Sequence, residues 1–226
     1  MAYNFDTIAA NYDRMNRLMT MGMDKCWRKR AVQGLHGKVL DVACGTGDMS
    51  VLLAKQGCTV TGVDISEEML NIARRKWYAG VSPAASASGS LAYQVADAEH
   101  LPFDEATFDA VTCAFGVRNF VHLERGLREM VRVLRPGGRM LILEMSTPDN
   151  PLVRPFYNIY TRKVIPMLGA RLAGNREAYT YLPESIERFP KGKAMLKILE
   201  NEGLKAKQKK LFFGVCRIYK CVKSEK

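Results

Sequence analysis

The stretch that most constrains the fold of this chain is residues 39–47, Val-Leu-Asp-Val-Ala-Cys-Gly-Thr-Gly. A β-branched apolar run ends in two glycines, and residues 48–53 then follow the apolar spacing of a helix. The pattern predicts a strand, a tight turn and a helix start, which together expose backbone N–H groups to a nucleotide. Gly45 and Gly47 suit that turn, because a Cβ would hinder both positive φ and the close approach of a ligand.

Acidic residues in or after the first three apolar runs extend this nucleotide-binding pattern. Asp41 lies within the first run, Asp64 ends the second, and Asp97-Ala98 follows the third. The carboxyl ends of parallel strands meet at one edge of a sheet, where an acid can accept hydrogen bonds from a ribose diol. We therefore predict a nucleoside beside Asp64 and Asp97, although an aspartate is also a common turn or cap residue. Ser50 replaces the third glycine of the dinucleotide fingerprint, which disfavours a nicotinamide dehydrogenase.

Predicted strands alternate with predicted helices along most of the chain. This order favours an α/β fold, a doubly wound, Rossmann-like, mostly parallel seven-stranded sheet with helices on both faces and a C-terminal antiparallel hairpin. The strands are predicted at residues 38–43, 58–64, 91–96, 108–115, 140–145, 205–213 and 215–222. The helices are predicted at residues 48–55, from the capping Ser66 onward, at 123–134, and before Gly203.

We predict a single domain with four parts. These are an N-terminal helical cover (1–36), a cofactor-binding core (37–146), a cap insertion (147–190), and a final helix with a β-hairpin (191–226). Residues 3–33 have the apolar spacing of a helix, and the Ala/Ser-rich residues 79–90 predict a surface loop. The cover contains four methionines that either pack on the core or adapt to an apolar substrate. They are Met15, Met19, Met21 and Met23.

The net charge of this 226-residue chain, +11 at pH 7, is concentrated at its C-terminal end. Residues 191–226 hold eleven Lys and Arg against three Glu, or +8 of the total. Lys205, Lys207 and Lys209 alternate as on an exposed edge strand, while an anionic membrane or nucleic acid is the alternative reading. No apolar stretch is long enough to span a membrane, and no signal peptide is visible. Six scattered cysteines without a C-x-x-C pattern indicate the cytoplasm.

Several motifs together resemble a known enzyme superfamily. Residues 39–47, Asp64, Asp97-Ala98 and residues 134–138 (Leu-Arg-Pro-Gly-Gly) look like the class I S-adenosylmethionine-dependent methyltransferases. Narrower motifs are similar to the menaquinone/ubiquinone-biosynthesis C-methyltransferase family, and this resemblance covers nearly the whole chain. They are Phe-Asp-x-Ile-Ala-x-x-Tyr-Asp at 5–13, Phe-Gly-Val-Arg-Asn at 115–119, Arg-Glu-Met-x-Arg-Val-Leu-Arg-Pro-Gly-Gly at 128–138, and Tyr-x-Tyr-Leu-Pro-Glu-Ser-Ile at 179–186.

The resemblance implies S-adenosyl-L-methionine as cofactor and the ring carbon of demethylmenaquinol as methyl acceptor, giving menaquinol. Some family members methylate a polyprenyl methoxybenzoquinol instead, and that alternative stays open. The implied cofactor-binding residues are Asp41, Gly45, Thr46, Gly47, Asp64, Asp97 and Ala98. Ala114 departs from members that place a cofactor-contacting serine there, so that contact is not carried over.

Methylation of a ring carbon requires alignment of carbon, methyl and sulfur, and a quinol hydroxyl that loses its proton. Arg118 is the catalytic candidate for stabilising the phenolate, and Asn119 the candidate for orienting it or the substrate. Arg118 is expected to act electrostatically, because a guanidinium does not readily release its proton. His122 is either a base or a helix-end residue. Tyrosines 157, 160, 179 and 181 are weaker candidates, and no cluster has metal-ligand spacing.

The expected partners follow from the same resemblance. They are a prenylated quinol substrate and an anionic membrane contacted peripherally at the inner face of the cell membrane, while nucleic acid is not expected. A homodimer is allowed by the sequence. Two other functions stay open, an RNA or small-metabolite methyltransferase and a cofactor-binding scaffold in a quinone-synthesis complex. Steeply salt-dependent RNA affinity would favour the RNA methyltransferase, and absence of turnover would favour the scaffold.

Overall fold

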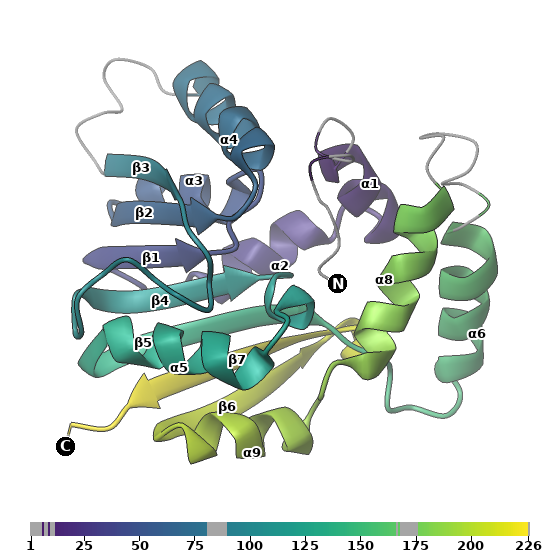
Figure 1. Cartoon of the computed structure of the whole chain (residues 1–226). Coiled ribbons are helices and arrows are strands. Elements are labelled where there is room, and N and C mark those ends of the chain that lie inside the picture. Colours follow the sequence, from purple (N-terminus) through teal and green to yellow (C-terminus); the bar gives the residue numbers. More distant parts are fainter. Residues whose placement is uncertain are drawn as a thin grey trace.

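The protein is built around a seven-stranded sheet. The computed structural model describes residues 6, 9, 12–80, 90–165, 167 and 176–225, except for the side chains of residues 15, 18 and 176–180. The strand order is β3-β2-β1-β4-β5-β7-β6 (Figure 1). The first five strands run parallel, and β7 pairs antiparallel with both β5 and β6, as predicted. The strands are β1 Lys38–Val42, β2 Thr59–Asp64, β3 Ser90–Val95, β4 Phe108–Ala114, β5 Leu134–Met145, β6 Leu204–Leu211 and β7 Cys216–Lys223.

Helices lie on both faces of this sheet and above its carboxyl edge (Figure 1). The longer ones are α1 Tyr12–Met19, α2 Asp24–Ala31, α3 Asp48–Lys55, α4 Glu67–Gly80, α5 Leu123–Val133, α6 Arg154–Ile159, α8 Arg176–Arg188 and α9 Lys193–Asn201. The short turns are η3 Val117–Asn119, η4 Tyr160–Val164 and η5 Phe212–Gly214. The predicted helical cover is divided between α1 and α2, because Met21 and Gly22 between them adopt positive φ.

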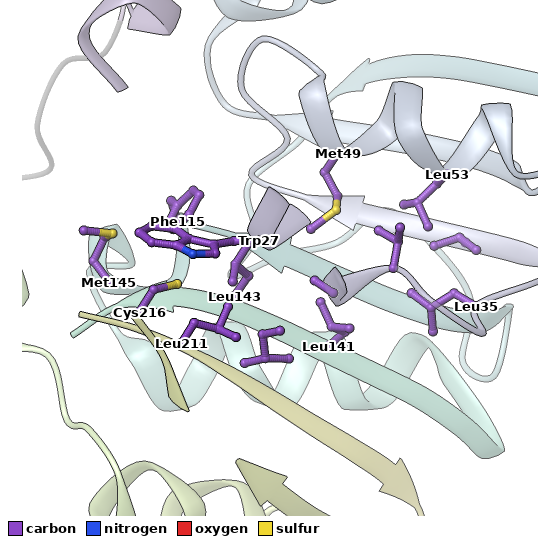
Figure 2. Close-up of a cluster of buried hydrophobic side chains, with 14 of the residues drawn as sticks. Trp27, Leu35, Met49, Leu53, Phe115, Leu141, Leu143, Met145, Leu211 and Cys216 are labelled. Atoms are coloured by element: carbon purple, nitrogen blue, oxygen red, sulfur yellow. The ribbon is translucent and has the colours of Figure 1, made fainter. Parts of the chain in front are cut away.

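The core lies in two layers, one on each face of the sheet. Alternate residues of β5 point to opposite faces, so Leu141 and Leu143 belong to one layer, and Met140 and Ile142 belong to the other. The first layer packs under α2 and α3 around Trp27, as Figure 2 shows. The second packs under α5 and α9. Apolar burial on both faces is what a mostly parallel sheet requires.

The structure differs from the sequence prediction at the start of β5. Residues 140–145 were the predicted strand, but β5 already begins at Leu134, which pairs with Phe108 of β4. The register then shifts, and Arg139 pairs with Ala110. The Pro-Gly-Gly segment lies between these two pairs as an irregularity within β5, so the pairing of β4 with β5 continues on both sides of it.

The predicted lysine alternation on the edge strand is confirmed. Lys205, Lys207 and Lys209 of β6 are exposed, and Leu204 and Leu211 at its ends are buried. Most of the predicted 79–90 loop, residues 81–89, lies outside the described residues. Within the described ranges, no helix is long and apolar enough to cross a membrane.

Candidate cofactor and acceptor site

A pocket of about 370 Å³ lies at the carboxyl ends of β1 and β4, where the strand order reverses. This switch point is the expected ligand position in an open α/β sheet, and the volume is in the ~300–1,000 Å³ range of small-molecule sites. Four of the predicted cofactor residues and one predicted catalytic residue line it. They are Gly45, Asp64, Asp97, Ala98 and Asn119.

Two residues with unusual backbone conformations shape the floor of the pocket. Ala43 after β1 has φ 50° and Phe115 after β4 has φ 60°, both in the left-handed region that non-glycine residues seldom adopt. Gly116 permits this close approach, because a Cβ there would lie 2.7 Å from the Ala43 Cβ and from the Cys113 Sγ. Such conformations cost about 1–3 kcal/mol each and are concentrated at functional sites.

The Asp64 carboxylate is held in a fixed position at the end of β2. One oxygen accepts the Gly45 N–H at 2.8 Å and the other accepts the Ser66 N–H at 3.0 Å. Burial raises the pKa of Asp64, and these two N–H groups oppose the shift. The Ser66 hydroxyl accepts the Met69 N–H at 3.1 Å, which confirms its predicted role as a helix cap. Each carboxylate oxygen retains a lone pair for a ligand hydroxyl.

The donor and acceptor pattern of the pocket fits an adenosine. Asp97 follows β3, and its Oδ1 accepts the Glu99 N–H at 2.8 Å while Asp64 lines the same pocket. Among the described residues, a Cβ on Gly45 would meet the Tyr12 ring at 3.7 Å and nothing else within 4 Å, so the glycine turn leaves space for a ligand there. Apolar side chains form much of the remaining wall, namely Ile65, Met69, Ala96, Ala98, Phe120 and Val121, and the polar side chains of Glu99, His100, His122 and Arg125 also line the pocket. Two acceptors and an apolar wall suit a ribose diol and a flat base.

Three of the predicted cofactor residues are not brought into this pocket. Asp41 is fully buried and accepts hydrogen bonds from the Ser50 hydroxyl at 2.5 Å and the Thr112 hydroxyl at 2.7 Å. Gly47 has φ 79°, and a Cβ there would lie 2.2 Å from the Tyr93 hydroxyl. The Thr46 side chain is buried and bonded to other side chains. These residues therefore stabilise the turn and do not line the pocket: the Asp41 and Thr46 side chains are hydrogen-bonded to other side chains, and a Cβ on Gly47 would contact Tyr93.

The buried Asp41 gives a testable pH dependence. Burial raises its pKa to about 6, and the Ser50 and Thr112 hydroxyls partly oppose that shift. A raised folded-state pKa favours folding fully below the unfolded value of about 3.9, and this contribution is lost as pH rises through about 6. We expect the unfolding free energy of the wild type to fall by about 2 kcal/mol relative to Asp41→Asn between pH 4 and 7. Denaturation curves across that range measure the unfolding free energies, and Asp104→Asn, at an exposed aspartate, is the control. If the unfolding free energies of the wild type and Asp41→Asn changed in parallel with pH, the prediction would be wrong.

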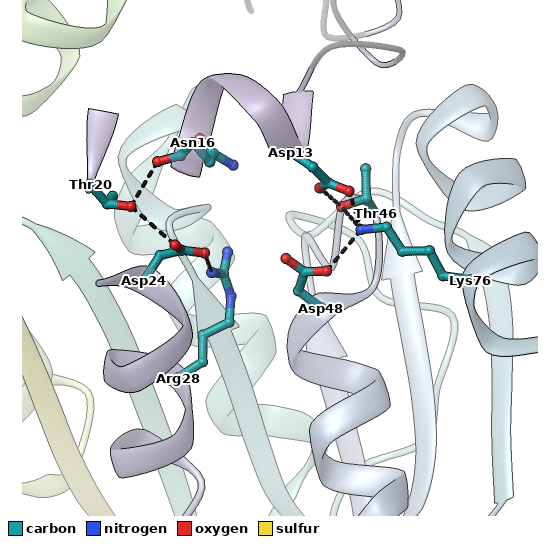
Figure 3. A network of polar contacts seen from close by, with 8 residues as sticks. All are labelled: Asp13, Asn16, Thr20, Asp24, Arg28, Thr46, Asp48 and Lys76. Atoms are coloured by element: carbon teal, nitrogen blue, oxygen red, sulfur yellow. Dashed lines mark hydrogen bonds and ion pairs between the residues drawn. The ribbon is translucent and has the colours of Figure 1, made fainter. Parts of the chain in front are cut away.

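A polar cluster ties α1 to the glycine turn (Figure 3). The Thr46 hydroxyl donates to Asp13 of α1 at 2.5 Å. Lys76 of α4 donates to the Thr46 hydroxyl at 2.9 Å and to Asp48 at 2.8 Å, and it also pairs with Asp13. Burial raises the pKa of Asp48, but Lys76, Arg28 and Arg17 together outweigh it, so the net shift is downward. One lysine therefore joins α1, the turn and the start of α3.

Replacing this lysine should loosen α1. In Lys76→Met, the partly buried Asp13 and Asp48 lose their shared cation. We expect the unfolding free energy to fall by about 1 kcal/mol and the amide hydrogens of α1 to exchange faster. Hydrogen exchange with mass detection measures the second effect. The control is Arg75→Met, at an exposed neighbour on the same helix. If the amide hydrogens of α1 exchanged equally fast in both variants, Lys76 would not hold α1 to the turn.

The structure places Arg118 outside the larger pocket. Its side chain lines a separate cavity of about 20 Å³, and its Nη1 donates to the Glu144 carboxylate at 2.7 Å and to the Phe115 carbonyl at 2.5 Å. Arg118 is 7% exposed and Glu144 is fully buried. Burial lowers the pKa of the guanidinium, but the charges of Glu144, Tyr12 and Tyr181 and the Glu144 hydrogen bond together outweigh this, so the net shift is upward and Arg118 stays protonated. Its Nε is buried without a hydrogen-bond partner in the described part of the chain.

Asn119 connects the pocket to α8 through Tyr181, and a second tyrosine, Tyr12, lies at the same pocket. The Tyr181 hydroxyl of α8 donates to Asn119 Oδ1 at 3.0 Å, and Tyr12 of α1 lines the same pocket as Asn119. Burial raises the pKa of both tyrosines, while the positive charge of Arg118 lowers each of them. A phenol bound in this region would experience the same positive charge. Sequence reasoning assigned no role to Tyr12, although it lies in the 5–13 motif, or to Glu144, an acid inside an apolar run.

The other predicted candidates lie in different places. His122 precedes α5 and lines the pocket, and its Nδ1 is 2.8 Å from Glu99 Oε2. Tyr157 and Tyr160 lie on α6 and η4, and burial raises the pKa of both. The Tyr179 side chain is outside the described ones. Among the described residues, no group of three or more His, Cys, Asp and Glu could hold a metal ion.

Comparison with known proteins places the chain among methyltransferases. Residues 2–223 match the ubiE/COQ5 methyltransferase family. A demethylmenaquinone methyltransferase of Bacteroides fragilis is 38% identical over 97% of this chain and 90% of its own. A ubiquinone/menaquinone biosynthesis C-methyltransferase UbiE of Geotalea daltonii is 40% identical over 95% of this chain and 92% of its own. A SAM-dependent methyltransferase of Thermotoga maritima shares the fold, with a TM-score of 0.68, 18% identity and coverage of 97% and 98% of the two chains.

Proposed function

This chain belongs to the ubiE/COQ5 methyltransferase family, and on that premise we propose that it is a C-methyltransferase of menaquinone biosynthesis. It transfers a methyl group to a ring carbon of demethylmenaquinol and releases menaquinol. The name and identity of the Bacteroides fragilis relative support this acceptor. The name of the Geotalea daltonii relative supports a second acceptor, a polyprenyl methoxybenzoquinol of ubiquinone biosynthesis.

The proposed cofactor is S-adenosyl-L-methionine, which supplies an electrophilic methyl group when bound. Asp64 accepts the ribose hydroxyls, and Asp97 with Ala98 borders the adenine. Gly45 leaves space for the ligand beside the turn, while Asp41, Thr46 and Gly47 stabilise the turn through contacts within the protein. These roles follow from the fixed Asp64 carboxylate and from the open space at Gly45, both of which suit an adenosine.

The observation that carries the proposed chemistry is the placement of Arg118 beside Asn119 and the two tyrosines. Burial raises the pKa of Tyr12 and of Tyr181 overall, and the Arg118 charge opposes that rise, so the same charge would favour the ionised form of a quinol hydroxyl in this region. A deprotonated quinol is electron-rich at the ring carbon, which is the required nucleophile. Arg118, which lines the adjacent small cavity, thus acts electrostatically and without lining the pocket. Asn119, which lines the pocket, orients the acceptor there.

A choice between acceptors tests this function. Purified protein is given S-adenosyl-L-methionine and either demethylmenaquinol or a polyprenyl methoxybenzoquinol, and the methylated products are separated by mass spectrometry. We expect the larger kcat/KM with demethylmenaquinol. A larger value with the benzoquinol would move the chain to the ubiquinone branch. Methylation of neither, with intact cofactor binding, would overturn the enzymatic proposal in favour of a scaffold.

A further inference from the structure

Arg28 of α2 is a buried cation whose hydrogen-bond donors are not all satisfied by the fold. The residue is 6% exposed, and its Nη1 donates to Asp24 Oδ2 at 2.5 Å (Figure 3). Its guanidinium carbon lies 4.9 Å from the centre of the Phe115 ring. Its Nε, however, is buried without a hydrogen-bond partner in the described part of the chain. An unpaired donor on a buried charged group costs free energy, so this Nε indicates that an acceptor is missing.

Arg28 lines a small cavity that adjoins the larger pocket. The cavity has a volume of about 10 Å³, which is room for a single water-sized group. Tyr12, Ala43 and Gly45 line both the cavity and the pocket, so these three residues form the wall between them. The charge of Arg28 reaches this wall, because burial raises the pKa of Tyr12 and the Arg28 charge opposes that rise. The unpaired donor therefore lies close to the side of the pocket that the glycine turn forms.

The strand order determines which end of the cofactor would reach this wall. Asp97 follows β3 and Asp64 follows β2, so an adenosine held by both occupies that side of the pocket. The next strand is β1, which ends in the glycine turn, and β4 lies beyond it. The sulfonium and the amino-acid chain of S-adenosyl-L-methionine would therefore extend toward Gly45 and Tyr12. That chain ends in an α-carboxylate and an α-ammonium group.

Arg28 is the best placed cation for the carboxylate. Lys76 already contacts two carboxylates and a hydroxyl, and Arg118 pairs with Glu144 beyond β4. Arg125 contacts the loop after β3, on the adenosine side of the pocket. A guanidinium also presents fixed N–H donors that match a carboxylate, and such charge-assisted hydrogen bonds are about twice as strong as neutral ones.

The acids near Arg28 select for a zwitterion rather than a simple anion. Asp41 and Asp48 also line the small cavity. Asp41 accepts hydrogen bonds from two hydroxyls, and Asp48 accepts one from the Lys76 ammonium. Their negative charge opposes a carboxylate but attracts the α-ammonium group that is attached beside it in an amino acid. An amino acid with its carboxylate on Arg28 therefore fits this region better than a free anion would.

We propose that Arg28 binds the α-carboxylate of S-adenosyl-L-methionine through its Nε–H and thereby recognises the amino-acid end of the cofactor. The proposal rests on the proposed function for the identity of this cofactor. It adds a binding residue from α2 to those at the strand ends. Holding both ends of the cofactor, at Asp64 and at Arg28, fixes the position of the methyl group between them, which direct displacement requires.

Calorimetric titration with ligands that differ at this end tests the proposal. Decarboxylated S-adenosylmethionine lacks only the α-carboxylate, and methylthioadenosine lacks the whole amino-acid end. We expect the wild type to bind S-adenosyl-L-methionine about 10- to 100-fold more tightly than the decarboxylated form, because one charge-assisted hydrogen bond contributes about that factor. This comparison needs no variant.

A double variant assigns the preference to Arg28. Asp24→Asn/Arg28→Gln removes both members of the buried ion pair, so that no unpaired charge is left behind. We expect this variant to bind S-adenosyl-L-methionine and its decarboxylated form equally and to keep wild-type affinity for methylthioadenosine. Arg30→Met, at an exposed arginine of the same helix, is the control and should keep the wild-type preference.

The outcomes separate this role from a structural one. Equal binding of the two forms by the wild type, or an undiminished preference in the double variant, would overturn the proposal. So would a matching loss of affinity for methylthioadenosine in the double variant, since Arg28 would then only support the turn. Wild-type protein that binds neither S-adenosyl-L-methionine nor methylthioadenosine would instead reject the proposed cofactor, and the role of Arg28 with it.

Discussion

An Asp64→Ala variant is expected to lose binding of S-adenosyl-L-methionine by about 100- to 10,000-fold. The carboxylate is fixed by the Gly45 and Ser66 N–H groups, and its remaining lone pairs face the pocket. Two hydrogen bonds from ribose hydroxyls to a charged acceptor contribute about 1.5–3 kcal/mol each, which gives this factor. The substitution also leaves two N–H groups of the turn without their acceptor. We therefore expect thermal stability to fall as well, by about 1–3 kcal/mol for each buried N–H left unsatisfied.

Calorimetric titration with the cofactor measures this loss. Asp64→Asn removes the charge but keeps the shape of the side chain, and its amide oxygen can still accept one N–H. We expect this variant to bind the cofactor with intermediate affinity. Asp104→Ala, at an exposed acid remote from the pocket lining, is the control. Cofactor binding by folded Asp64→Ala with wild-type affinity would show that the ribose does not lie at β2.

Arg118→Ala is expected to lose both stability and turnover. It leaves the fully buried Glu144 without its cation, and removing one partner of a buried ion pair costs about 3–5 kcal/mol. Turnover falls because the positive charge that opposes the burial-induced rise in the pKa of phenols at the site is gone. Denaturant unfolding and steady-state kinetics measure the two losses separately.

A double variant distinguishes the electrostatic role from the structural one. Arg118→Met/Glu144→Met removes both buried charges and should recover much of the stability lost in Arg118→Ala. Turnover should stay low, and the rise of kcat with pH should move to higher pH, because a quinol without the nearby cation ionises less readily. Recovery of stability together with wild-type turnover and an unchanged pH profile would reduce Arg118 to a structural residue.

Local patterns predicted the fold and which strand ends meet at the pocket. The β-branched run before Gly45 and the acids at Asp64 and Asp97 are consecutive signals in the sequence, and a parallel sheet necessarily collects strand ends at one edge. The alternating lysines of β6 were predictable for the same reason, since a strand has a period of two. The family resemblance supplied the acceptor, which the pocket geometry alone does not identify.

Side-chain direction at the strand ends was not predictable. Arg118 and Asn119 are adjacent, yet the short turn after the strained Phe115 directs one to Glu144 and the other to the pocket. The partnership of Arg118 with Glu144 joins residues from β5 and the turn after β4, and no local pattern encodes such a pair. The exposure of Leu152, Phe156 and Ile159 was also not predicted, because the sequence does not show which side of a cap helix faces solvent.

Transfer of the methyl group to a ring carbon, rather than to oxygen, is revealed by the position of an isotopic label in the product. The purified protein is incubated with S-adenosyl-L-methionine carrying a carbon-13 methyl group and with demethylmenaquinol, and the product is examined by mass spectrometry and NMR. We predict one labelled methyl group on the quinone ring carbon, giving menaquinone after oxidation. A label on a hydroxyl oxygen, or no labelled product from protein that binds the cofactor, would contradict the account.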